Sequence, residues 1–99
     1  MARFDVFRER HDGGYLLDCQ ADILRGLDTR LTVPLFPHGE APLPAGRLNP
    51  VLVIDGARFV MMTQYASAIR CALLGERVGG LGDEQAAIMN ALDMLLTGY

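Results

Sequence analysis

The segment DEQAAIMNALDMLLTGY (Asp83–Tyr99) is the only long helical pattern in the chain. Wound at about 100° per residue, it places its apolar side chains on an arc that covers well over half of the circumference. A helix that lies on one small sheet needs an apolar arc of only about 100°. The surplus predicts burial against a second surface, most simply a second copy of the chain, although single exposed methionines are the alternative. The apolar residues are Ala87, Ile88, Met89, Ala91, Leu92, Met94, Leu95 and Leu96.

The other side of this helix is narrow and polar. Asn90, Asp93 and Thr97 form that stripe. At the start of the segment, Asp83 is a suitable N-cap residue, and Glu84 adds a second negative charge where the helix dipole favours it. We therefore expect the helix to begin at about residue 83.

The chain before this helix predicts strands and turns. Phe4–Phe7 alternates apolar and polar side chains, as in a half-buried strand. The residues at 12–14, Asp-Gly-Gly, supply a turn, and Tyr15–Gln20 continues as a second strand that pairs with the first in an antiparallel hairpin. Residues 21–30 then predict a loop or a short turn of helix.

A third strand is expected at Leu31–Leu35, with Pro34 at an edge or a strand end because proline cannot donate to a ladder. The segment Pro34–Pro50 contains five prolines and two glycines. Such a composition predicts an irregular excursion over the surface.

The strongest local signal is a second hairpin. Val51–Ile54 and Ala57–Thr63 flank Asp55-Gly56, the dipeptide preferred in a type I′ turn. A further apolar run, Ala68–Leu74, is followed by a glycine-rich link to the helix. These patterns predict a mainly β fold with a C-terminal α-helix: five or six short antiparallel strands curled into a small barrel, in one domain over residues 1–99.

Composition narrows the possible functions. The chain is 51% hydrophobic, has a net charge of −3, and all nine of its basic residues are arginine. An acidic chain has no excess positive charge with which to bind a polyphosphate backbone, so autonomous DNA binding is not expected. Cys19 and Cys71 lie in apolar runs and are expected to be buried, reduced thiols of a cytoplasmic protein. Together with His11 and His38 they lack zinc-ligand spacing, and no membrane span is evident, so we expect no metal, cofactor or membrane partner.

Three blocks of sequence resemble the CcdB family of bacterial toxins. They are YLLDCQADIL at residues 15–24, RFVMMT at 58–63, and the terminal stretch from LLGERV to ALDMLLTGY, in the same order and at matching distances. The resemblance implies a small SH3-like barrel of the CcdB/MazF type with a C-terminal helix. It also implies a twofold homodimer that is not an enzyme, without catalytic residues or cofactor.

The resemblance also implies partners. Family members bind the A subunit of DNA gyrase and trap the enzyme while both DNA strands are cut. A CcdA-like antitoxin neutralises them through a disordered C-terminal segment. Toxin and antitoxin together repress their operon, and the antitoxin contacts the operator DNA, so DNA would be only an indirect partner of this chain.

The gyrase-binding residues implied by the resemblance lie at the end of the helix and in the DIL segment. Where the family ends in Phe-Trp-Gly-Ile, this chain has Leu-Thr-Gly-Tyr, so a threonine replaces the tryptophan most needed for killing. The terminal tyrosine either supplies the missing ring or simply covers the helix end. The candidate residues are Ile23, Leu24, Asp93, Leu96, Thr97, Gly98 and Tyr99.

Two alternatives remain open at this point. A MazF-like ribonuclease needs an acid/base pair in a basic groove, for which His11, His38, Arg30 and Arg58 are the only candidates. The second alternative is a protein with this fold that binds the antitoxin but no longer poisons gyrase. The missing tryptophan is its main support.

Overall fold

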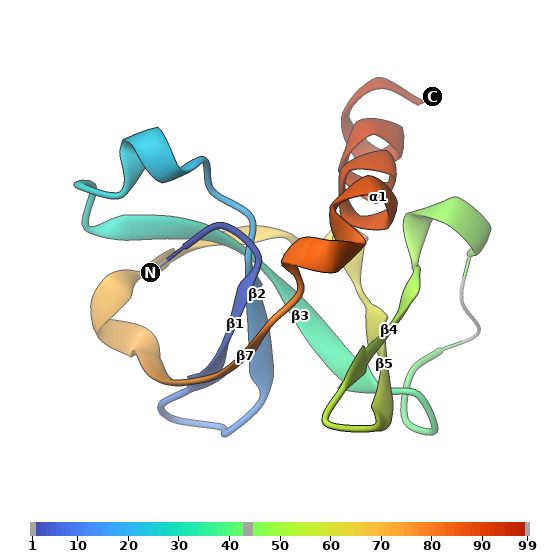
Figure 1. Ribbon diagram of the computed structural model, residues 1–99, viewed down its shortest axis with the longest axis horizontal. Coiled ribbons are helices and arrows are strands. Elements are labelled where there is room, and N and C mark those ends of the chain that lie inside the picture. The colour runs from blue at the N-terminus through green and yellow to red at the C-terminus, as the bar shows by residue number, and fades with distance from the viewer. Residues whose placement is uncertain (1, 43–44, 99) are drawn as a thin grey trace.

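The computed structural model describes residues 2–42 and 45–98, and it shows a curled antiparallel sheet with one helix packed against it (Figure 1). The predicted mainly β fold with a C-terminal helix is confirmed, although the described residues form a half-barrel of seven strands instead of five or six. The strands are β1 (Asp5–Glu9), β2 (Tyr15–Asp18), β3 (Thr29–Pro37), β4 (Val51–Ile54), β5 (Ala57–Met61), β6 (Ser67–Arg70) and β7 (Leu74–Gly80).

Both predicted hairpins are present. β1 pairs with β2, with Val6 opposite Leu17, and β4 pairs with β5. Asp55 and Gly56 have φ angles of 51° and 79°, as the predicted type I′ turn requires. The neighbouring strands follow the order β4-β5-β3-β2-β1-β7, and β6 adds to β3.

The prediction for the third strand was wrong in its length and position. β3 extends from Thr29 to Pro37 and is central, because it pairs with β2, β5 and β6. Pro34 is tolerated in its middle for a geometric reason. In an antiparallel strand the N–H and C=O of one residue point to the same side, and the Pro34 carbonyl accepts from the Met62 N–H (3.0 Å). Residues 29–32 of β3 pair with β6, and residues 35–37 pair with β5. The N–H that proline lacks would point into the gap between these two pairings.

The glycine-rich link before the helix is also a strand. The apolar run Ala68–Leu74 is divided between β6, a 3-10 turn η4 (Cys71–Leu73) and the start of β7, which pairs with β1. A Cβ atom at Gly75 would lie 2.7 Å from the carbonyl oxygen of Arg8. Glycine at this position lets β7 approach β1 closely, so the residues that suggested a linker are needed for sheet pairing.

The first strand is not half-buried as predicted. It begins at Asp5, after Phe4 in a positive-φ conformation (71°), and both Val6 and Phe7 are buried although they point to opposite faces. β1 lies between β2 and β7 in the strongly curled part of the sheet, and register shifts interrupt its pairing with β7 near Phe7. A strand in this position has side chains covered on both faces.

The helix α1 (Gln85–Thr97) buries Ile88, Ala91 and Leu92 in the core of the half-barrel. Asp83 is not its N-cap as predicted, because Gly82–Glu84 forms a 3-10 turn, η5. Glu84 takes the N-cap position, and its side chain makes no capping hydrogen bond. At the other end Gly98, with φ 80°, donates its N–H to the Met94 carbonyl (3.0 Å). That left-handed glycine ends the helix.

The two cysteines differ in burial. Cys19 is buried and free, as predicted, whereas Cys71 is free but only half-buried. Cys71 lies in η4 at the surface end of β6, where the apolar run leaves the sheet. Burial, with a smaller contribution from Asp18, raises the pKa of the Cys19 thiol to about 12.

This difference predicts the thiol reactivity of the folded protein. At mildly alkaline pH a disulfide reagent should react quickly with Cys71 and at least about tenfold more slowly with Cys19, because Cys19 is both protonated and shielded. The release of the chromophore should be followed with and without denaturant, with Cys71→Ser as the control. Rapid reaction of native Cys71→Ser would contradict the buried position of Cys19.

Candidate functional site at the end of the helix

The last turn of α1 stands out from the sheet at the outer edge of the molecule (Figure 1). We call this surface the helix tip. All of its described residues are exposed, and the exposed fractions of Met94, Leu95 and Leu96 are 38%, 39% and 77%. The helix tip comprises Asp93, Met94, Leu95, Leu96, Thr97 and Gly98.

The rest of the protein covers α1 only as far as Leu92. Ile88 and Leu92 are buried on one side of α1, and helical spacing places Leu95 next on that side. Leu95 is nevertheless exposed, so the cover on this side of the helix ends before it. The surplus apolar surface predicted from the sequence is therefore found on the last turn, where it faces away from the protein's own core.

Two polar features shape the helix tip. The Thr97 hydroxyl donates to the Asp93 carbonyl (2.7 Å), so it is already paired within the helix. The Asp93 side chain is exposed beside this apolar surface.

Gly98 turns the chain away from the helix axis. The residue that follows, Tyr99, lies outside the described residues, so its predicted role stays a prediction.

A second exposed apolar surface surrounds the 3-10 turn η1 (Asp22–Leu24). Ile23 is 90% exposed and Leu24 is 47% exposed. The Gln20 side chain braces this loop, because its Nε2 donates to the Leu24 carbonyl (3.1 Å) and its Oε1 accepts from the Leu31 N–H (3.0 Å). The loop thus holds its apolar side chains outward on a fixed backbone.

A third exposed apolar residue of this loop was not predicted from the sequence. Leu27 is 51% exposed, next to Gly26. It is the third large apolar residue within ten positions, a signal that was available in the sequence.

The structure does not bring the two surfaces together within one chain. In Figure 1, η1 lies at the upper left of the molecule and the helix tip at the top, right of centre. Ile23 and Leu24 can therefore join the helix tip only in contact with a partner that spans both surfaces, or through a second copy of the chain.

The residues considered for a ribonuclease do not form a site. Arg30 is buried, and its Nε donates to the Asp18 carboxylate (3.0 Å). His11 and His38 are exposed in separate turns. Within residues 2–42 and 45–98, histidine, cysteine and acidic side chains do not gather in groups of three that could hold a metal ion. Over the same residues no helix is both long and apolar enough to cross a bilayer.

An outward-facing apolar helix end of this kind is typical of the class of proteins that present a surface to a partner protein. The comparison with protein families agrees with this class. The family model described as CcdB protein matches residues 3–98. The chain therefore belongs to the CcdB family, a family of toxins from toxin–antitoxin systems rather than of classical enzymes.

Proposed function

We propose that this protein is a homodimeric toxin that binds the A subunit of DNA gyrase through the helix tip and traps the enzyme on cleaved DNA. The observation that carries the proposal is the 77% exposure of Leu96, together with exposed Met94 and Leu95, at the end of an otherwise packed helix. Contiguous apolar surface of this kind is uncommon on a protein that acts alone.

Dimerisation supplies a partner for part of this surface. A twofold contact between two helix ends would cover apolar side chains such as Met94 and Leu95 and would place two helix tips side by side. Paired tips suit a twofold target, because each copy contacts one subunit. Ile23 and Leu24 would contribute supporting contacts from the η1 loop, and Asp93 favours an arginine or lysine on the target.

A CcdA-like antitoxin is the proposed regulatory partner. The toxin is acidic, with a net charge of −3, so contact with operator DNA is assigned to the antitoxin. A disordered antitoxin segment that folds on the toxin can cover a large surface and remain reversible.

Gyrase poisoning is tested directly with purified protein. Supercoiled plasmid, gyrase and ATP are incubated with the native chain, and linear DNA after detergent and protease treatment is the expected result. Thr97→Trp should lower the concentration for half-maximal cleavage about two- to thirtyfold, because a cation–π contact contributes about 0.5–2 kcal/mol. Thr97→Val is the matched control, since it changes the side chain without adding a ring.

The outcomes separate the alternatives. Linear DNA with Thr97→Trp but none with the native chain would favour a protein that binds its antitoxin without poisoning gyrase. Cleavage of an RNA substrate by the metal-free protein would favour a ribonuclease instead.

A further inference from the structure

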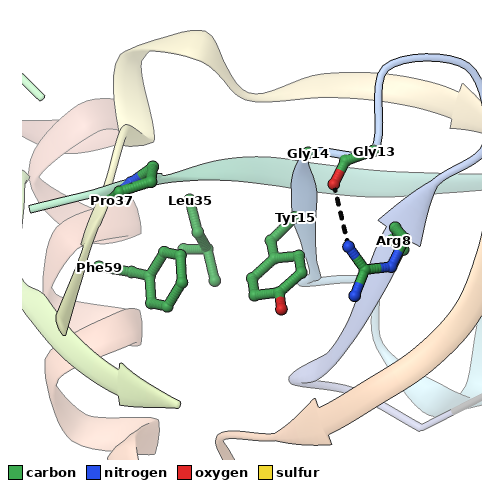
Figure 2. Close-up of a pocket in the computed structure, with 7 residues that line it drawn as sticks. All are labelled: Arg8, Gly13, Gly14, Tyr15, Leu35, Pro37 and Phe59. Atoms are coloured by element: carbon green, nitrogen blue, oxygen red, sulfur yellow. Dashed lines mark hydrogen bonds between the residues drawn. The ribbon is translucent and has the colours of Figure 1, made fainter. Parts of the chain in front are cut away.

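A pocket opens at the end of the half-barrel away from the helix tip. Its volume is about 220 Å³, and its lining residues come from β1, the β1–β2 turn, β2, the end of β3 and β5 (Figure 2). The helix tip is at the opposite end of the molecule in Figure 1. The side chains that line the pocket are Arg8, Tyr15, Leu35, Pro37 and Phe59.

The interior of the pocket is aromatic and aliphatic. The rings of Tyr15 and Phe59 are half-buried and stand next to each other, with centroids 5.1 Å apart and planes inclined at 35°. Buried Leu35 lies beside both rings (Figure 2). This surface is suited to one apolar side chain, which would be covered on several sides at once.

Arg8 places a positive charge at the mouth. Its guanidinium lies 5.2 Å from the centre of the Tyr15 ring, and its Nη1 donates to the Gly13 carbonyl at 3.5 Å. Its Nε is 3.7 Å from the Glu76 carboxylate, and the Arg8 side chain is 45% exposed. These polar contacts are longer than the 2.7–2.9 Å of a charge-assisted hydrogen bond. The guanidinium is thus positioned over the ring and can donate hydrogen bonds to a carboxylate that comes closer.

We propose that this pocket binds an extended peptide segment of a partner protein, in which an apolar side chain is followed by a single carboxylate. The apolar side chain would lie against Tyr15 and Phe59, and the carboxylate would pair with Arg8. The volume supports a side chain over a free small molecule, because ligand pockets usually measure about 300–1,000 Å³. This site is separate from the helix tip and does not depend on which target the tip binds.

The charges around the mouth favour one carboxylate over a polyanion. Glu76 lies beside Arg8, and the Glu9 carboxylate accepts from the backbone N–H groups of His11 and Asp12 at 2.9 Å each, which holds it in the adjacent turn. Binding of single-stranded nucleic acid needs a continuous basic groove along the backbone. Here the Arg8 guanidinium has the Glu76 carboxylate beside it and another carboxylate in the adjacent turn, so a strand of phosphates would be repelled.

The test is a titration of the isotope-labelled full chain, followed by amide chemical shifts. The probes are Ac-Gly-Phe-Glu-Gly-amide, the same peptide with alanine for phenylalanine, and the same peptide with glutamine for glutamate. We expect the first peptide to shift Gly13, Gly14, Tyr15 and Phe59. The alanine peptide should bind about tenfold more weakly, because it leaves the rings uncovered.

Substitution of Arg8 isolates the charge contact. Arg8→Gln should weaken the affinity for the glutamate peptide about tenfold and the affinity for the glutamine peptide less than about twofold. This difference is expected if Arg8 and the glutamate interact directly. Arg58→Gln is the matched control, because Arg58 is the residue before Phe59 in β5 and points to the other face of the sheet. It should change neither affinity. Leu96→Ala should also leave the peptide affinity unchanged, since the helix tip is elsewhere.

Several results would overturn the proposal. They are shifts that cluster at the helix tip, equal losses for Arg8→Gln and Arg58→Gln, or an Arg8→Gln loss that is the same for both peptides. Binding of hexathymidylate more tightly than the glutamate peptide would assign the pocket to nucleic acid instead. None of these results depends on gyrase, so a failure here is distinguishable from a failure of the proposed function.

Discussion

Asp18→Ala should destabilise the protein by about 3–5 kcal/mol, because it leaves the Arg30 guanidinium buried without its counter-ion. Both side chains are almost completely inaccessible, with exposed fractions of 0% and 1%. The Asp18 carboxylate accepts from Nε and Nη2 of Arg30, whereas the buried Nη1 already lacks a partner among the described residues. The loss of stability should appear in urea denaturation measured at a fixed protein concentration.

A surface pair provides the control. Arg8 and Glu76 are 3.7 Å apart and largely exposed, so Glu76→Ala should change stability by less than about 1 kcal/mol. Replacing both buried partners, as in Asp18→Leu with Arg30→Met, should recover most of the loss, because no charge then remains in the interior. If Asp18→Ala unfolds at the same urea concentration as Glu76→Ala, the buried ion pair is not the stabilising contact described here.

Substitution of Ile88 should lower the stability of the protein, whereas substitution of Leu96, eight positions further along α1, should weaken gyrase trapping. Ile88→Ala should cost about 2–5 kcal/mol of stability, because Ile88 is fully buried against the half-barrel. Leu96→Ala should change the stability of the isolated chain by less than about 0.5 kcal/mol, because Leu96 is 77% exposed. The same Leu96 variant should require about thirtyfold more protein to trap gyrase, as for a contact residue that contributes about 2 kcal/mol.

The two measurements must be made separately. Stability is read from urea denaturation at low protein concentration, where dimerisation contributes least, and gyrase trapping is read from linear DNA. Ile23→Ala, in the exposed η1 loop, shows whether this second apolar surface contributes to gyrase trapping. Full gyrase trapping by Leu96→Ala would remove the helix tip from the proposed interface, whereas unfolding of Leu96→Ala would show that the tip is part of the core.

The elements that local sequence could predict are those with local causes. The Asp55-Gly56 turn requires two positive φ angles, which this dipeptide adopts readily, so the β4–β5 hairpin was predicted correctly. The helix was recognised from its period, and only its start was misplaced. The 3-10 turn at Asp22–Leu24 matched the expected short turn of helix.

The misplaced elements have nonlocal causes. Pro34 lies within a central strand because two different strands pair with β3 on either side of it, and no local pattern contains that arrangement. The glycines at 75, 79 and 80 resemble a linker, yet they belong to a strand. Gly75 is needed there because β1 comes within 2.7 Å of the position of a Cβ atom.

The two candidate binding surfaces differ in the same respect: one was visible in the local sequence and the other was not. The excess of apolar residues near Leu96 was visible in the helical pattern, and the structure shows which of them are exposed. The Arg8 pocket was not predictable, because its residues come from β1, β2, β3 and β5 and are brought together only by the curl of the sheet.

The sequence by itself determined the class of fold, the two hairpins and an apolar helix with more surface than one sheet can cover, because turn chemistry and periodicity act between neighbouring residues. Tertiary structure alone decided that Asp18 and Arg30 form a buried pair, that β7 pairs with β1, and that Ile88 is covered while Leu96 is not. These outcomes depend on which strands meet and on how far the rest of the protein covers α1. Such long-range contacts are set by packing of the whole chain and have no counterpart in a short stretch of residues.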